Sequence, residues 1–267
     1  MIETPEATIR EPVTLQIHQG VATITLANPA KRNALSRDLV AGLATHLAAA
    51  AVSDEVAVIV LTHSGTTFCA GADLSEVRTA GVTESDFPDL LVQLATLGKP
   101  TIARINGAVR AGGIGLMAAC DIVLTTDLAS FGFPEVRLGV VAAVISTVVL
   151  PHMSSRGARE LFLTGERFDA ERGLREGLVT AVVDENDLDA VVARYARSLR
   201  LGGPDALTAT KQLLLDYAKS DTLSTQVERM HILSAQHFGS DEAKEGMSAL
   251  RDRRAPQWAR DVGPEAS

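Results

Sequence analysis

The sequence predicts an α/β fold. Short runs of aliphatic and β-branched residues alternate with segments of helical periodicity along most of the chain. With 267 residues and 46% hydrophobic content, the chain is long enough to bury a core without disulfides or metal ions. After about residue 188 the alternation ends and the pattern is helical almost throughout. These observations predict an α/β core followed by a helical C-terminal region.

The first elements follow from local patterns. Apolar and polar residues alternate on both sides of Gln19-Gly20, which predicts a β-hairpin. Ser36 is a suitable N-cap for an amphipathic helix. A continuous apolar run after it is typical of a strand buried on both faces. In order, we expect strands at 13–18 and 21–26, a helix at 37–52, a strand at 56–62, and a loop or mobile helix at 75–89.

The rest of the chain continues the alternation before it becomes helical. The nearly apolar run 138–150 is shorter than the roughly 20 residues that span a bilayer, so we interpret it as a buried helix. Residues 253–267 are expected to form a loose tail. The other expected strands are 101–105, 122–125, 130–133 and 179–183, and the other expected helices are 112–120, 140–150, 154–163 and 170–176.

Charge and cysteine content exclude several classes of protein. Lys and Arg number 25 and Asp and Glu 33, a net charge of −8 that argues against nucleic acid as the main partner. The two cysteines, Cys69 and Cys120, cannot make a disulfide framework or a cysteine zinc site. No histidine or carboxylate cluster indicates a metal. The acidic N-terminus is unlike a signal peptide, so we expect a cytoplasmic protein with no membrane partner.

Two segments of small residues follow predicted strands. The first is Ala70–Asp73, and the second is Gly112-Gly113 at the start of a predicted helix. Small residues let a ligand approach the backbone, and unpaired N–H groups from two such loops could form an oxyanion hole. The alternative is that the glycines only make tight turns. The second segment is not a dinucleotide fingerprint, because it lacks the pattern Gly-x-Gly-x-x-Gly.

Several blocks of sequence, taken together, resemble the enoyl-CoA hydratase/isomerase (crotonase) family. The resemblance covers roughly residues 13–254, and its blocks occur in the order of the family. They are Asn28–Leu35, Val58–Thr62, Phe68–Leu74, Lys99–Gly107, Gly112-Gly113, Ala118–Ile122, Pro134–Gly139, Leu163–Gly165 and Gly177–Val179.

The resemblance implies a fold, a ligand and a set of site residues. The fold would be a spiral of β-β-α turns over residues 1–195, with a helical region at 196–267 that builds trimers or hexamers. The substrate would be an acyl-CoA thioester, so that coenzyme A enters with the substrate and no separate cofactor is needed. The oxyanion hole would be the N–H groups of Ala72 and Gly112. Residues implied to contact the substrate or CoA are Lys31, Arg32, Ala34, Ala70, Gly71, Asp73, Leu74 and Gly113, although Lys31 and Arg32 could equally be solvated.

The sequence departs from the family at one catalytic position. Family hydratases hold a water between two glutamates, and the positions here are Gly115 and Glu135. Gly115 supplies no acid or base. Glu135 is retained, and beside an acyl ligand it could serve in acid/base catalysis with a raised pKa. The alternative for Glu135 is a solvated or salt-bridged loop carboxylate.

One remaining glutamate is compatible with two reactions. An isomerase moves a proton between two carbons with a single base, whereas hydratases similar to bacterial methylglutaconyl-CoA hydratases share the run Leu138–Ser146. We therefore expect hydration of a 2-enoyl-CoA with a branched or carboxylated acyl group, with isomerisation as the alternative. A catalytically weak acyl-CoA-binding protein is a third possibility.

Arg110 stands two positions before Gly112, where an apolar residue is usual in the family. Its guanidinium could bind a second carboxylate on the substrate through paired hydrogen bonds. The alternative is an arginine that extends to solvent or pairs with a nearby acidic residue.

Overall fold

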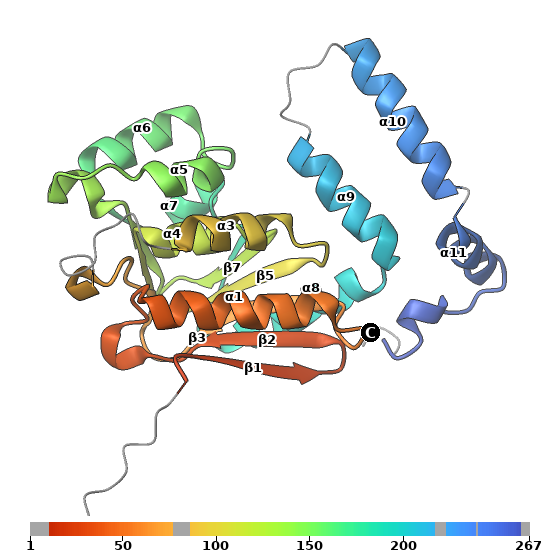
Figure 1. Ribbon diagram of the computed structural model, residues 1–267, viewed down its shortest axis with the longest axis horizontal. Coiled ribbons are helices and arrows are strands. Elements are labelled where there is room, and N and C mark those ends of the chain that lie inside the picture. Colours follow the sequence, from red (N-terminus) through yellow and green to blue (C-terminus); the bar gives the residue numbers. More distant parts are fainter. Residues whose placement is uncertain (1–10, 77–85, 217–222, 239, 263–267) are drawn as a thin grey trace, which may run out of the picture.

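The computed structural model describes residues 11–76, 86–216, 223–238 and 240–262. Its strands form two sheets, one of six strands in the order β1-β2-β3-β5-β7-β10 and one of four in the order β4-β6-β8-β9 (Figure 1). The strands are β1 (Val13–His18), β2 (Val21–Leu26), β3 (Val58–His63), β4 (Thr67–Cys69), β5 (Thr101–Ile105), β6 (Ala108–Arg110), β7 (Ile122–Thr126), β8 (Ser130–Gly132), β9 (Arg167–Asp169) and β10 (Ala181–Val183).

Helices connect the strands and then continue alone to the C-terminus. Among the described residues, no helix combines the length and apolar character that crossing a bilayer requires. The α-helices are α1 (Arg37–Val52), α3 (Phe87–Thr96), α4 (Gly112–Ala118), α5 (Ala143–Val149), α6 (Ser155–Thr164), α7 (Ala170–Arg175), α8 (Leu188–Arg200), α9 (Pro204–Asp216), α10 (Leu223–Phe238) and α11 (Asp241–Arg251).

Three successive β-β-α turns build the centre of the molecule. Each turn contributes one strand to the large sheet, the next strand to the small sheet, and then a helix: β3-β4-α3, β5-β6-α4 and β7-β8-α5. Equivalent strands of successive turns pair in parallel, with Ile59 opposite Thr101 and Thr67 opposite Ala108. The expected spiral of β-β-α turns is therefore present.

Strand β3 shows why a continuous apolar run was needed here. Alternate side chains of a strand point to opposite faces of the sheet. Ile59 and Leu61 belong to the core under α1 and α3, whereas Val58 and Val60 pack with α8 on the other face. Since helices cover both faces, every residue of this strand is buried.

Several expected elements are confirmed. The hairpin pairs β1 and β2 antiparallel, with His18 opposite Val21. The Ser36 hydroxyl accepts a hydrogen bond from the N–H of Leu39 at the start of α1. The boundary expected at 195/196 falls inside α8, and the division into two parts stays a prediction.

Two sequence-based expectations were wrong, one for the run 138–150 and one for the C-terminal segment. The segment 75–89 was expected to be a loop or a mobile helix; α3 begins within it at Phe87, and residues 77–85 lie outside the described residues. The apolar run 138–150 is not a buried helix: α5 buries only Ile145 and Val149, because a single stripe of it packs inward, and Val141 is 84% exposed.

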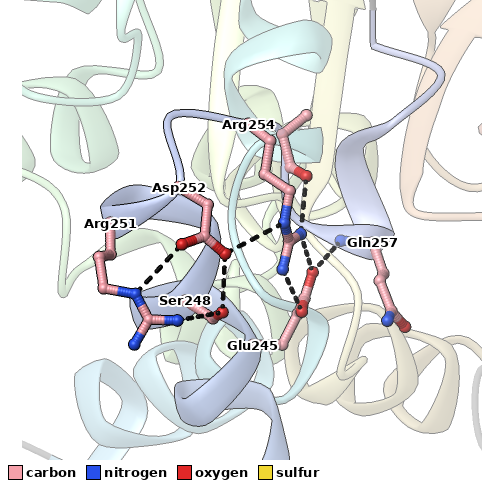
Figure 2. Close-up of polar contacts among 7 residues, drawn as sticks. Glu245, Ser248, Arg251, Asp252, Arg254 and Gln257 are labelled. Atoms are coloured by element: carbon pink, nitrogen blue, oxygen red, sulfur yellow. Dashed lines mark hydrogen bonds and ion pairs between the residues drawn. The ribbon is translucent and has the colours of Figure 1, made fainter.

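The C-terminal segment up to residue 262 is not a loose tail. The indole N–H of Trp258 donates to the carbonyl of Leu201, and Ala259 and Val262 are buried. Figure 2 shows the ion pairs that fold this segment back: Arg254 donates to both carboxylate oxygens of Glu245, which also accepts from the N–H of Gln257.

Helices α9, α10 and α11 extend away from the two sheets, as Figure 1 shows in blue. Helix α9 is attached to the core at two points. Lys211 pairs with Asp121 at 2.8 Å, and Thr208 donates to the carbonyl of Gly98. Helix α11 returns to α9, where the carboxylate of Glu242 accepts hydrogen bonds from the first backbone N–H groups.

Candidate active site

A cavity of about 580 Å³ opens where the first turns of α1 and α3 meet the loops before α4 and α5. Its inner wall is mostly apolar, and carboxylates surround its mouth. The lining residues are Leu35, Ser36, Arg37, Asp38, Val40, Ala41, Ala72, Asp73, Glu76, Asp86, Phe87, Ala111, Gly112, Glu135, Val141, Ala142, Ala143, Val144 and Ile145. The volume lies in the range of sites for small organic ligands.

The backbone N–H groups of Ala72 and Gly112, which lie in this wall, donate to no acceptor in the described part of the chain. Leu35 forms a parallel bridge with Ala72, in which the N–H of Leu35 donates to Gly71 and the N–H of Asp73 donates to Leu35. The N–H of Ala72 is thereby left unused. Among the described residues, neither the N–H of Ala72 nor that of Gly112 donates to a protein acceptor. Two such donors in one wall can stabilise an oxygen that becomes negative.

The two loops that carry these donors are in close contact. A Cβ atom added to Gly71, whose φ is +89°, would lie 2.8 Å from Cβ of Ala111 and 3.6 Å from the backbone nitrogen of Gly112. A Cβ atom on Gly112 would lie 2.5 Å from Cδ1 of Leu35. A side chain at Gly71 would collide with Ala111 and strain the backbone, whereas a side chain at Gly112 would require the end of the Leu35 side chain to move.

Glu135 supplies a half-buried carboxylate to the cavity. It lies in the 3₁₀ turn Pro134–Leu138, which follows β8. Its Oε2 atom is buried, and among the described residues that atom has no hydrogen-bond partner. Burial raises the pKa of Glu135 above its ordinary value, and a hydrogen bond to its own backbone opposes this only in part. A carboxylate with one buried, unpaired oxygen in a cavity is suited to accept a proton from a ligand.

The structure shows what surrounds Gly115 in place of a second carboxylate. An added Cβ would lie 2.6 Å from Cγ2 of Ile145 and 3.5 Å from Cδ1 of Leu91. Helix α5 therefore packs directly on α4 at this point. Ile145 also lines the cavity, so an apolar surface stands where a side chain at position 115 would project.

The loop 28–35 lies along the segment 70–73, as the sequence predicted. Asn33 fixes this loop, since its side chain accepts from the N–H of Asn28 and donates to the carbonyls of Ser64 and Thr67. The N–H of Ala70 donates to the carbonyl of Arg32. The structure thus brings together most of the residues expected to contact CoA, namely Lys31, Arg32, Ala34, Ala70, Gly71, Asp73 and Leu74.

Of these residues, only Asp73 lines the cavity itself. Lys31 is 56% exposed and pairs with Asp73 at 3.1 Å. Hydrogen bonds from Ser75 and Lys31 lower the pKa of Asp73 to about 2. Gly113 faces away from the cavity, because a Cβ there would lie 2.7 Å from Cβ of Cys69. Contact of any of these residues with CoA stays a prediction.

Arg110 lies outside the lining of the cavity. Its guanidinium donates to the carbonyl and hydroxyl oxygens of Ser130 and to the carbonyl of Val109. These bonds join β6 to β8 in the small sheet. A role for Arg110 in binding a substrate carboxylate stays a prediction, and in this conformation its donors point to β8.

Sequence reasoning missed several residues of the cavity. Arg37 and Phe87 begin α1 and α3, and no motif marked either of them. No motif marked Glu76 either, and its carboxylate accepts a hydrogen bond from the N–H of Arg37 and so caps α1. The apolar wall formed by α5 could not be predicted from the sequence, because it depends on how α5 packs on α4.

Comparison with known proteins shows which family has this architecture. A profile of the enoyl-CoA hydratase/isomerase family matches residues 16–261. The chain is 32% identical to (E)-benzylidenesuccinyl-CoA hydratase of Thauera aromatica, covering 92% of this chain and 98% of the relative. It is 31% identical to 2,3-dehydroadipyl-CoA hydratase of Escherichia coli, covering 90% and 95%. A solved enoyl-CoA hydratase structure from Mycobacterium avium is 39% identical, with a TM-score of 0.72 and coverage of 94% and 100%.

Repeated β-β-α turns surround a cavity whose lining contains two backbone N–H donors and the carboxylate of Glu135, an arrangement that can stabilise a developing negative charge and transfer a proton. The profile match over most of the chain makes the assignment specific. The chain belongs to the enoyl-CoA hydratase/isomerase family and has the crotonase fold.

Proposed function

We propose that this protein hydrates a 2-enoyl-CoA thioester, with Glu135 as the proton-transfer group. The thioester oxygen would accept hydrogen bonds from the N–H groups of Ala72 and Gly112. Glu135 would accept a proton from water while the water oxygen bonds to C3, and it would then return that proton to C2 of the resulting enolate, which regenerates the carboxylate. Coenzyme A enters as part of the substrate, and the proposal requires no separate cofactor.

The observation that carries this proposal is the state of Glu135. Its buried Oε2 atom has no protein partner among the described residues, and it shares one cavity with the two unused N–H donors. A structural carboxylate would normally be paired when buried, because desolvating an unpaired charge is costly. A carboxylate oxygen left unpaired in the same cavity as these two donors supports a catalytic role.

One observation favours the second candidate, isomerisation. Ile145 and Leu91 surround the position from which a second carboxylate would project at Gly115. A single base is sufficient to move a proton from C2 of a 3-enoyl-CoA and return it to C4. The two reactions differ in whether water is added, so they can be separated with the same variant proteins.

The acyl group of the substrate is the finer part of the proposal. Two relatives are named as hydratases of benzylidenesuccinyl-CoA and 2,3-dehydroadipyl-CoA, whose acyl groups carry a second carboxylate. The basic side chain that lines the cavity in the described part of this chain is Arg37. We propose a branched or carboxylated enoyl-CoA on this basis, and a panel of neutral and carboxylated substrates tests it.

The test of the reaction is the substitution Glu135→Gln. The amide keeps the size of the side chain but cannot accept the proton, so kcat should fall by about 10²–10⁴-fold. Loss of absorbance of the conjugated 2-enoyl thioester measures hydration, and turnover of a 3-enoyl-CoA without water addition measures isomerisation. CoA binding, followed by the shift of Tm on adding acyl-CoA, should be retained.

A matched control is Glu185→Gln, the same chemical change at an exposed position in the short turn before α8. It should leave kcat unchanged. Full activity of the Glu135→Gln variant would reject Glu135 as the proton-transfer group. A wild-type protein that binds acyl-CoA but turns over neither type of substrate would favour the acyl-CoA-binding alternative.

A further inference from the structure

Ala111 has a backbone conformation that side chains rarely adopt. Its φ is 49° and its ψ is −122°, at the position just before Gly112. This region of φ and ψ is favoured by glycine, because a Cβ atom crowds the neighbouring peptide groups. Residues held in such conformations are strained and persist only where surrounding contacts enforce them.

Those enforcing contacts are present on both sides of the residue. The N–H of Ala111 donates to the carbonyl of Gly132 in β8, at 3.2 Å. Its carbonyl accepts a hydrogen bond from Ile114 in the first turn of α4, at 2.9 Å. The two peptide groups that flank the Cα atom of Ala111 are therefore held, one by the small sheet and the other by α4.

The methyl group of Ala111 lies against the other donor loop. Its Cβ atom is 2.8 Å from the position where Gly71 would carry a Cβ, so it packs closely against that glycine. Gly71 directly precedes Ala72 and Ala111 directly precedes Gly112. The methyl group of Ala111 thus lies between the segment that carries the Ala72 N–H and the segment that carries the Gly112 N–H.

We propose that Ala111 is a positioning residue, whose methyl group and strained backbone fix the spacing and direction of the Ala72 and Gly112 donors. This inference rests on the proposed function, in which those donors bind the thioester oxygen. Glycine would adopt the same φ and ψ without strain, but it would remove the methyl contact with Gly71 and widen the range of accessible conformations. Preorganised donors stabilise developing charge better than donors that must reorient.

The prediction is that stability and catalysis change in opposite directions in the Ala111→Gly variant. Relief of strain should raise Tm by about 2–4 °C. Loosening the donors should lower kcat by about 10-fold, less than the roughly 10²–10³-fold expected when a donor is removed. KM should stay within about twofold, because the acyl-CoA contacts elsewhere are unchanged. A residue with a purely structural role would not lower kcat while raising Tm.

Two further variants separate the methyl group from the backbone effect. Ala111→Ser keeps the Cβ atom and should keep a kcat close to that of the wild type. Gln19→Gly is the matched control, since Gln19 has a φ of 46° in the hairpin turn, away from the cavity. It replaces a positive-φ residue by glycine in the same way and should leave kcat unchanged.

A second readout does not depend on turnover of an enoyl-CoA. Acetoacetyl-CoA forms an enolate that absorbs in the near ultraviolet, and its enolate fraction on the protein reports stabilisation of a negative thioester oxygen. This fraction should be lower in Ala111→Gly than in the wild type and in Gln19→Gly.

The outcomes distinguish this inference from the proposed reaction. Wild-type kcat and an unchanged enolate fraction in Ala111→Gly would overturn the positioning role while leaving the proposed reaction intact. A wild-type protein that turns over no enoyl-CoA would reject the proposed reaction, and a reduced enolate fraction in Ala111→Gly would still support the positioning role. A fall in Tm of Ala111→Gly would contradict the strain.

Discussion

At the scale of the single residue, the burial of the Glu135 carboxylate favours its proposed function but lowers the stability of the folded protein. A carboxylate whose pKa is raised by burial binds its proton more tightly in the folded than in the unfolded protein. Once deprotonated, the group is charged in an environment that disfavours charge, so it lowers the free energy of unfolding. The same burial makes the carboxylate a better base for a bound ligand.

The substitution Glu135→Gln should therefore stabilise the protein in a pH-dependent manner. Because the folded-state pKa is raised, the wild type is favoured at low pH and loses stability as pH rises through that pKa. The amide does not titrate, so the variant should have the larger free energy of unfolding at pH 7–8. The difference should disappear below the ordinary glutamate pKa of 4.5.

Urea unfolding of both proteins at pH 8 and pH 4 measures this difference. The exposed Glu185→Gln variant should show no gain at either pH. A Glu135→Gln protein less stable than the wild type at pH 8 would mean that the carboxylate has a stabilising partner, contrary to the structure.

For single residues, the sequence predicted which residues line the site better than it predicted where their side chains project. Glu135, Ala72 and Gly112 were identified from the resemblance and do line one cavity. The structure shows that a side chain added at Gly112 would meet Cδ1 of Leu35, a contact that the sequence does not indicate. The positive φ of Ala111 left no local signal, since alanine usually adopts other conformations.

At the scale of elements, the contact between α4 and α5 shapes the inner wall of the cavity. Gly115 allows the close approach, with Cγ2 of Ile145 2.6 Å from the position of an added Cβ. Gly115→Ala should therefore cost about 1–3 kcal/mol through overpacking. Ile145→Ala alone should cost about 2–5 kcal/mol, and the double variant less than the sum by about 0.5–3 kcal/mol.

Denaturant unfolding of the four proteins gives the coupling energy between the two positions. Gly42→Ala is the control, because Gly42 is also helical but its added Cβ would meet Val13 at an ordinary 3.5 Å. That substitution should stabilise by about 0.5–1 kcal/mol. Additive effects of Gly115→Ala and Ile145→Ala would show that the helices are not in contact at this point.

Elements with strong local signals were predicted, and those that depend on distant partners were not. The hairpin, α1 and β5 carry periodicity, turn residues or a cap within their own sequence. Strands β4, β6 and β9 have three residues each, too few for a pattern, and exist because they pair with one another or with β8. The start of α3 was not predicted, and no side-chain hydrogen bond caps its first turn.

At the scale of the whole molecule, the C-terminal helices leave apolar surface uncovered. Leu214, Ile232, Phe238 and Leu250 are between 54% and 81% exposed, on helices that extend away from the two sheets (Figure 1). The rim beside the cavity is similar, with Val141 84% exposed. Large exposed apolar patches are rare on monomers, and closed symmetric assemblies are the usual way to bury such side chains.

We therefore predict that the protein is a trimer or hexamer in which these helices pack against neighbouring subunits. Light scattering should give three or six times the chain mass of 28.2 kDa. Phe238→Glu and Leu250→Glu each place a charge on the exposed apolar surface and should shift the protein toward monomers at micromolar concentration. Val52→Glu is the control, because Val52 is 82% exposed at the isolated end of α1, and its variant should keep the wild-type mass. A wild-type mass of 28.2 kDa would mean that these helices remain uncovered in solution, and the apolar surface would then need another partner.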